Sequence, residues 1–269
     1  MATTHVRFEV RDAIGYVTLS RPDKHNGLHE PMFRELHAAA KAIRRDRRVR
    51  AVILSGEGPS FCAGLDFGAL SRNRSFIPRF FLKLPWREAN GFQRFAYEWR
   101  TLPVPVICVV HGNCFGGGLQ LALGADIRVA TPDSRWSVME AKWGLIPDMS
   151  ATTTLATLTR YDIAQELTMT GRVFSGEEAA DYGLTTRLSE EPMAEAEAIA
   201  KAIAERSPDQ TAATKLLFRK TWNASPRVAL LWERWIQLRL LGRENQRIAT
   251  HNGLAKGKEP RAFRDRSLF

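Results

Sequence analysis

Two apolar runs that end in glycine-rich turns constrain the fold of this chain most strongly. Residues 49–58 (VRAVILSGEG) and 104–112 (VPVICVVHG) are rich in β-branched residues and carry little charge in their centres. Continuous apolar runs of this length are typical of parallel strands that are buried on both faces. Segments with helical spacing alternate with them along the chain. The pattern therefore predicts an α/β fold with mostly parallel strand pairing.

The remaining elements divide the chain into two regions. Further strands are predicted at residues 15–22, 126–131 and 136–140, and helices at residues 30–46, 150–158 and 162–169. After about residue 190 only helical patterns follow, over residues 191–206, 209–222 and 227–249. We therefore expect a core region at residues 1–200 and an all-helical C-terminal region at residues 201–269. The last of these helices is more apolar than one packed face requires, which fits packing on the core or a subunit interface.

Residues 71–100 combine many aromatic residues with many basic ones. Two interpretations remain open for this segment. It is either an element of the core or a mobile cover that lines an apolar pocket.

The chain carries a formal net charge of +10 at pH 7, which favours an anionic partner. A phosphorylated small molecule, an anionic membrane and nucleic acid all fit, as does a basic surface with no specific partner. The charges are scattered rather than gathered in one stripe, which disfavours nucleic acid. No apolar run reaches the ~20 residues of a membrane span, and no signal peptide is apparent. Three cysteines without a CxxC pair predict a reducing compartment, and we expect a cytoplasmic protein without a metal site.

Two glycine-containing turns follow the two apolar runs, in SFCAGLDF (residues 60–67) and CFGGGLQ (residues 114–120). In a parallel sheet such turns lie at the same edge, where backbone N–H groups from both can point at one oxygen. Such a pair would stabilise an oxyanion. Tight packing of a helix against a strand explains the same glycines equally well. A phosphate-binding loop is disfavoured, because no Lys-Ser/Thr pair follows.

Four segments carry a resemblance to a known family: RPDKHNGL, SFCAGLDF, PVICVVHGNCFGGGLQLALGADIRVAT and MEAKWGLIPD. In order and spacing they resemble the crotonase superfamily, the enoyl-CoA hydratase/isomerase group, over nearly the whole chain. The resemblance implies a spiral of ββα units with a helical C-terminal trimerisation region, assembled as trimers or hexamers. It implies an acyl-CoA thioester substrate, which itself carries the coenzyme A, so that no separate cofactor is expected. It also implies that the N–H groups of Leu65 and Gly117 hold the thioester oxygen as it becomes an enolate.

The acidic residues of the resemblance depart from the hydratase pattern. Hydratases carry glutamates at the positions of Gln120 and Glu140, and a neutral amide is neither an acid nor a base, although it can orient water. The dienoyl-CoA isomerases resemble this chain in having acids at Glu140 and Asp148, although they carry an aspartate where Gln120 stands.

We therefore expect Glu140 to remove a proton beside the carbonyl and Asp148 to return one further along the acyl chain, which shifts a double bond. A turn role for Asp148 remains open. Glu140 would then act as the single base of an isomerisation, or of a slow hydration in which Gln120 places the water. Hydration of a 2-enoyl-CoA, as in fatty-acid β-oxidation, and binding of acyl-CoA without catalysis remain alternatives. A Gln120→Glu change is expected to raise hydration.

The resemblance also implies positions that contact coenzyme A. Lys24 and His25 lie in the first motif, and Ala63 and Asp66 are expected beside the adenine. Lys258, in AKGKEPRAF, matches a lysine that reaches the phosphates. A solvated basic tail is the alternative for Lys258.

Overall fold

The computed structural model describes residues 4–72, 76–254 and 259–269, and its centre is a six-stranded sheet of order β1-β2-β3-β4-β6-β9. The strands are β1 (Val6–Arg11), β2 (Ile14–Leu19), β3 (Ala51–Gly56), β4 (Val106–Val110), β6 (Ile127–Ala130) and β9 (Arg187–Leu188). β1 pairs antiparallel with β2, and all other neighbours in this sheet are parallel. The predicted α/β fold with mostly parallel pairing is confirmed.

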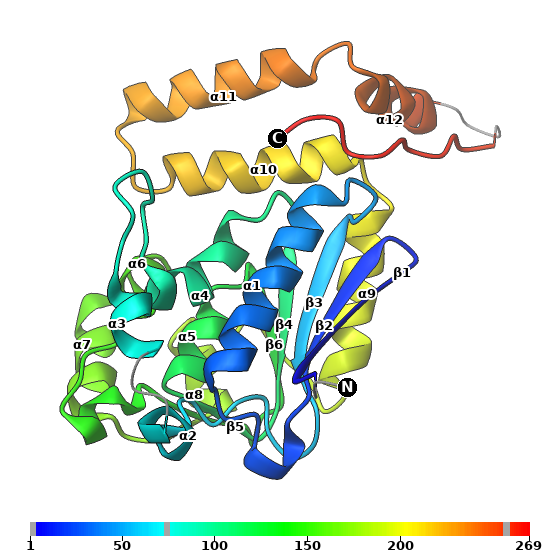
Figure 1. Ribbon diagram of the computed structural model, residues 1–269. Helices are drawn as coiled ribbons and strands as arrows, with labels where there is room; N and C mark the ends of the chain where they lie inside the picture. Colours follow the sequence, from blue (N-terminus) through cyan, green and yellow to red (C-terminus); the bar gives the residue numbers. More distant parts are fainter. Residues whose placement is uncertain (1–3, 73–75, 255–258) are drawn as a thin grey trace.

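Helices cover both faces of the sheet (Figure 1). On one face lie α1 (Glu30–Arg45), α4 (Gly91–Thr101) and α5 (Gly117–Leu123), and on the other lies α9 (Pro192–Ala204). Alternate residues of β3 point to opposite faces of the sheet. Val52 and Leu54 pack with α1, α4 and α5, and Ile53 packs on the side of α9. Burial on both faces explains why β3 and β4 read as continuous apolar runs.

A second, three-stranded sheet follows β4 and carries part of the site. It contains β5 (Asn113–Phe115), β7 (Arg135–Ser137) and β8 (Phe174–Ser175). The predicted strand at residues 136–140 is too long, because β7 ends at Ser137 and the 3₁₀ helix η2 (Met139–Trp143) begins two residues later. The remaining elements before α9 are η1 (Pro22–Lys24), α2 (Phe67–Arg72), α3 (Phe76–Phe81), α6 (Ala151–Leu158), α7 (Tyr161–Thr170) and α8 (Gly176–Asp181).

The C-terminal helices α10 (Pro208–Thr221), α11 (Pro226–Leu240) and α12 (Glu244–Leu254) lie beyond the end of the sheet (Figure 1). A single helix over residues 227–249 is not observed. The chain breaks between α11 and α12 at Gly242, whose φ of 72° is a left-handed conformation that ends a helix. The boundary near residue 200 stays a prediction, and α9 packs on β2, β3, β4 and β6 of the sheet.

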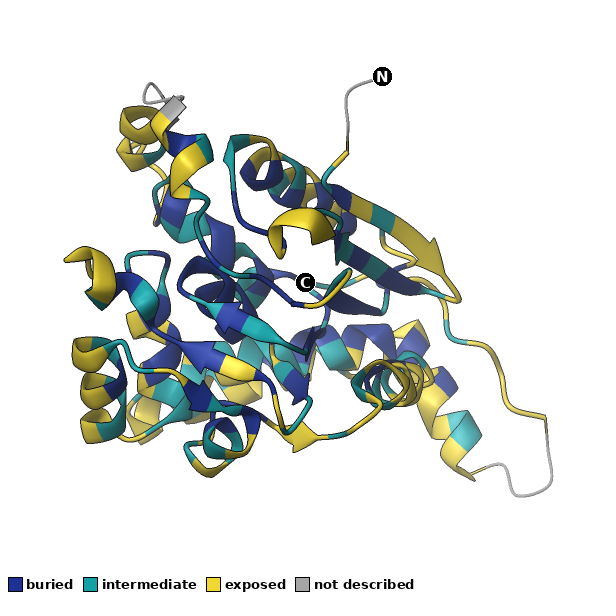
Figure 2. Ribbon diagram, turned by 90° about the horizontal axis from the view of Figure 1, so that it is seen from below, coloured by how far each residue is buried: buried dark blue, intermediate teal, exposed yellow. Residues whose placement is uncertain are grey.

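The aromatic segment 71–100 divides into two parts. α4 begins with a capping box in which Asn90 and Gln93 exchange side-chain to backbone hydrogen bonds. It buries Phe92, Phe95 and Trp99, so this part is an element of the core. In contrast, the end of α3 and the connection to α4 expose large apolar side chains: Phe81, Leu82, Leu84 and Trp86. Figure 2 shows exposed segments, in yellow, gathered at the periphery of the molecule around a buried centre.

Candidate active site

The two glycine-containing turns lie side by side. Cys62 donates its backbone N–H to Asn113 O at 2.9 Å, and Phe115 donates to Cys62 O at 3.0 Å. These bonds form an isolated parallel bridge between Cys62 and Cys114 of β5, which brings the turn after Cys62 against the start of α5. The common edge that the sequence predicted is therefore observed.

The backbone of Gly64 lies beside the first turn of α5. Its φ of 88° is in the left-handed region that favours glycine, and an ideal Cβ placed there would be 3.7 Å from Gly117 N. Leu65 is the next residue. Within residues 4–72, 76–254 and 259–269, the N–H groups of Leu65 and Gly117 donate to no acceptor. The geometry thus places two free backbone donors in neighbouring turns.

Two glycines of the GGG run, Gly116 and Gly118, have separate structural reasons. Gly116 has a φ of 49°, and a Cβ there would lie 3.3 Å from Glu140 Oε1. A Cβ on Gly118 would lie only 2.5 Å from Cys62 O, which is an impossible contact. The packing interpretation of these glycines and their role in bringing backbone close to the acid therefore both hold.

Gly118→Ala is expected to lower the free energy of unfolding by about 1–3 kcal/mol, the typical cost of overpacking. The new methyl group would force α5 away from the backbone of Cys62, which cannot yield as a flexible side chain can. Urea unfolding measures the change. The matched control is Gly253→Ala in α12, where a Cβ meets nothing within 4 Å and alanine favours the helix. Equal effects of the two substitutions would contradict the close packing of α5.

The acids are organised by one amide. Glu140, in η2, accepts a hydrogen bond at Oε1 from Gln120 Nε2 at 2.6 Å. The Oε1 of the same amide accepts the backbone N–H of Met149 at 2.7 Å. Gln120 itself is fully buried. The amide therefore holds both the Glu140 carboxyl group and the residue that directly follows Asp148.

The other carboxyl oxygen of Glu140 is available for chemistry. Glu140 Oε2 is buried and has no hydrogen-bond partner in the described part of the chain. A buried oxygen without a hydrogen-bond partner destabilises the fold. A substrate whose acidic C–H group points at this oxygen would supply the missing partner. Burial raises the pKa of Glu140 above its usual range, and the nearby Asp148 carboxylate raises it further. A proton acceptor with a raised pKa is better matched to abstraction near neutral pH.

Asp148 is the second acid within electrostatic reach of Glu140. It is half-buried, and burial raises its pKa as well. Ser150, two residues further on, has a φ of 71°, a left-handed conformation that is uncommon outside glycine. This turn begins α6 and lets the Met149 N–H face Gln120. Sequence reasoning missed Met149, because a backbone donor leaves no signal in the side-chain pattern.

The positions expected near coenzyme A form a second group beside the turn at Gly64. Ala63 donates its N–H to His25 O at 2.9 Å, and His25 Nδ1 lies 3.0 Å from Ser60 Oγ. Asp66 forms an ion pair with Arg21 at 2.9 Å. Lys24 is exposed at the end of η1. Lys258 lies outside the described residues.

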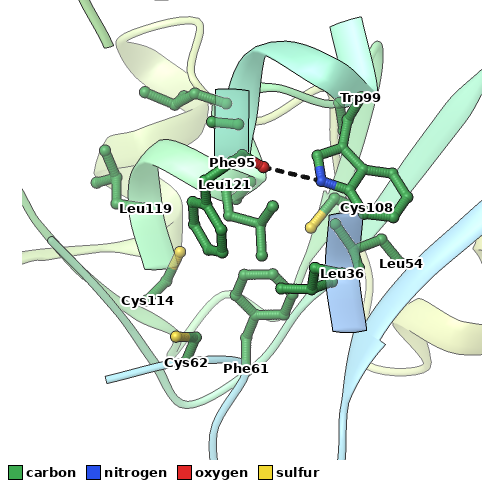
Figure 3. Packing of buried hydrophobic residues seen from close by; sticks show 14 of the residues in the cluster. Leu36, Leu54, Phe61, Cys62, Phe95, Trp99, Cys108, Cys114, Leu119 and Leu121 are labelled. Carbon is green, nitrogen blue, oxygen red and sulfur yellow. Dashed lines mark hydrogen bonds between the residues drawn. The ribbon is translucent and has the colours of Figure 1, made fainter. Parts of the chain in front are cut away.

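The cysteines do not supply a nucleophile. Cys62, Cys108 and Cys114 are fully buried in the core (Figure 3), and burial raises the pKa of each thiol, that of Cys62 to about 12. Thiols in such surroundings stay protonated and unreactive. Among the described residues, no three His, Cys, Asp or Glu side chains come together as a metal site would require. In the same ranges, no helix has both the length and the apolar composition of a membrane span.

Comparison with known proteins gives a consistent picture. A model of the enoyl-CoA hydratase/isomerase family matches residues 9–259. The hydroxycinnamoyl-CoA hydratase-lyase of Pseudomonas fluorescens is 27% identical over 253 residues, covering 90% of this chain and 88% of that protein. The mitochondrial Delta(3,5)-Delta(2,4)-dienoyl-CoA isomerase of Rattus norvegicus is 29% identical over 232 residues, covering 78% and 71%. The crystal structure of an enoyl-CoA hydratase from Polaromonas sp. JS666 superimposes with a TM-score of 0.84 at 27% identity, covering 96% of this chain and 99% of that one.

Proposed function

The chain belongs to the enoyl-CoA hydratase/isomerase family, and from that premise we propose that it shifts a double bond in an enoyl- or dienoyl-CoA thioester. The family acts on acyl-CoA thioesters, and its members are enzymes. The choice among its reactions rests on the two acids and the one amide of the site.

In the proposed reaction the thioester oxygen lies between the N–H groups of Leu65 and Gly117. Glu140 Oε2 takes a proton from the carbon beside the carbonyl, and the electron pair passes into the carbonyl as an enolate. The two backbone donors stabilise the negative charge on that oxygen. Asp148 gives its proton to a carbon further along the conjugated chain, and the carbonyl re-forms with the double bond moved. Glu140 then releases its proton to solvent and Asp148 takes one up from solvent, so that the substrate has lost one proton and gained one and the enzyme is restored.

One observation carries the preference for isomerisation over hydration. The position that would hold the second hydratase acid is Gln120, and its amide is already bonded to Glu140 and to Met149 N–H. Hydration requires one group to deprotonate water while another protonates carbon. In this chain the second acid is Asp148, whose pKa is raised by burial, so that it keeps its proton to higher pH than an exposed aspartate does.

The proposal extends to binding and assembly. Lys24 and His25, with Ala63 and Asp66 in the neighbouring turn, are the proposed contacts of coenzyme A, and Lys258 is proposed for its phosphates.

We propose a homotrimer or hexamer, since α11 exposes Leu230, Leu231, Trp235 and Leu238, and apolar surface of this kind marks interfaces. A cytoplasmic location is part of the proposal and is supported by three cysteines that all remain free thiols.

Incubation with 2-enoyl-, 3-enoyl- and 3,5-dienoyl-CoA tests the proposal. Isomerisation changes the ultraviolet absorbance of the conjugated thioester and leaves the mass unchanged, whereas hydration adds the mass of one water. We expect the 3-enoyl or 3,5-dienoyl substrate to be converted without a mass change. Consumption of the 2-enoyl substrate alone, with water added, would identify a hydratase. Tight binding without any turnover would identify an acyl-CoA binding protein.

A further inference from the structure

A cavity of about 450 Å³ lies between α10 and the core, and it is separate from the acids (α10 is labelled in Figure 1). Neither Glu140 nor Asp148 lines it. Residues from α4, α5, β6, α6, α9 and α10 surround it, and much of its surface is apolar: Pro105, Leu123, Ala125, Ile127, Leu158 and Ile203. A volume of about 300–1,000 Å³ with a largely apolar lining is typical of small-molecule sites.

Three cations and one acid also line this cavity. Lys215 is nearly buried, and its Nζ lies 2.6 Å from Asp126 Oδ2. The same ammonium group donates to the backbone oxygens of Trp99 and Val104, at 2.8 and 2.9 Å. Asp126 Oδ2 also accepts the N–H of Val106. The single acid is therefore neutralised by Lys215.

Neither arginine of the cavity forms an ion pair with a residue that the structure describes, and Asp126, whose charge attracts Arg100, is already paired with Lys215. Within the described ranges, the Thr157 hydroxyl is the one acceptor of Arg100 side-chain hydrogen bonds, at 3.4 Å from both terminal nitrogens. Arg219 makes no hydrogen bond and no ion pair with any residue the structure describes, although it is half-buried. Burial lowers the pKa of Arg100 and repulsion from Arg219 lowers it further, although attraction by Asp126 acts in the opposite direction. Unpaired cations at an apolar surface are costly, and an anion between them removes much of that cost.

We propose that this cavity binds a small organic anion, with its carboxylate between Arg100 and Arg219 and its hydrocarbon body on the apolar surface below. A guanidinium presents paired N–H donors that match the two oxygens of a carboxylate. The volume of about 450 Å³ suits a small molecule, and the test distinguishes it from an acidic side chain of a second copy of the chain. The site is distinct from the proposed acyl-CoA site, so either can fail without the other.

Trp222 lines the cavity and provides a local optical probe. Octanoate combines a carboxylate with a hydrocarbon chain. It is titrated into the full chain while tryptophan fluorescence is followed. Acetate supplies the carboxylate without the long hydrocarbon chain, and 1-octanol supplies the chain without the carboxylate. We expect octanoate to change the fluorescence at concentrations about tenfold lower than either, and we expect Trp222→Phe to remove the change.

Arg219→Gln is expected to weaken octanoate binding by about tenfold or more, as the loss of a hydrogen bond to a charged group does. Lys220→Gln removes the same charge from the next position of α10, which does not line the cavity, and should leave the affinity unchanged. Circular dichroism melts confirm that both variants fold, and both should retain isomerase activity.

Three results would overturn the proposal. The first is equal binding of octanol and octanoate, and the second is equal weakening by the two variants. The third is octanoate binding only when sedimentation shows that an oligomer has dissociated, because the cavity would then be filled by a second copy of the chain.

Discussion

Glu140→Gln is expected to lower kcat/KM for double-bond isomerisation by about 10²–10⁴-fold, the typical contribution of a positioned general base. Glutamine keeps the size of the side chain and can still accept the hydrogen bond of Gln120 through its amide oxygen. Only the ability to take a proton is lost. Substrate binding, measured as the Kd of a 2-enoyl-CoA, should therefore change little.

Proton exchange in D₂O separates Glu140 from Asp148. Glu140→Gln should stop the incorporation of deuterium beside the thioester carbonyl, because no enolate forms. Asp148→Asn should allow that exchange to continue and should block the movement of the double bond, because its proton is needed at the distal carbon. Nuclear magnetic resonance of the recovered thioester reports both positions. A variant of Asp148 that isomerises at the wild-type rate would assign that residue to the turn before α6 instead.

The pH dependence has a definite sign. The raised pKa of Glu140 means that its ionised, basic form appears only above the usual range of a glutamate, so activity rises with pH through a limb above pH 4.5. The pKa of Asp148 is raised as well, and the two carboxyl groups titrate as a pair, so activity falls again at higher pH when the pair loses its remaining proton. Asp148→Asn removes a negative charge beside Glu140, so the rising limb of deuterium exchange should move to lower pH. An unchanged limb would mean that the two carboxyl groups do not interact.

As the pH rises through the titration of Glu140, the free energy of unfolding should fall while the activity rises. A carboxyl group whose pKa is higher in the folded state than in the unfolded state destabilises the fold as the pH rises through that interval. At pH 7 Glu140 therefore costs stability, and Glu140→Gln should unfold at an equal or higher urea concentration than the wild type. Lower stability of the variant would mean that its loss of activity reflects misfolding.

The parts of the fold that were predictable are those in which local pattern and burial agree. β3 and β4 are buried on both faces, so their sequences carry an unbroken apolar signal that ends at the glycine turns. β1 has no such signal. Only Val6 is buried, and the strand exists because it pairs with β2 at the edge of the sheet. The break at Gly242 is equally hard to foresee, since glycine is tolerated within many helices.

For the candidate site, sequence spacing identified the turns and the acids but not how they are connected. Gln120 is separated from Glu140 by 20 residues and from Met149 by 29, and only the folded chain brings the three together. From the sequence alone, Gln120 indicates only that the glutamate of the hydratases is missing. In the structure its amide also binds Glu140 Oε1, so that Oε2 is the oxygen without a partner among the described residues. Neither residue propensity nor periodicity predicts this contact.

Gln120→Glu is expected to raise hydration of a 2-enoyl-CoA by about 10²-fold or more over the wild-type rate. A protonated glutamate reproduces both hydrogen bonds of the amide, donating to Glu140 Oε1 and accepting from Met149 N–H. Two carboxyl groups at that separation cannot both ionise, so they share one proton at neutral pH. The pair then contains an acid and a base, as hydration requires.

Gln120→Met is the matched control, because it fills the same buried volume without a proton or a hydrogen bond. It should release Glu140 Oε1 and lower isomerisation while leaving hydration at the wild-type level. Mass spectrometry of the thioester measures hydration directly, since the product carries one added water. If Gln120→Glu folds and binds 2-enoyl-CoA but hydrates it no faster than the wild type, the amide is not what suppresses hydration. The limit would then lie in the space for water beside Glu140, because the acid–base pair would already be complete.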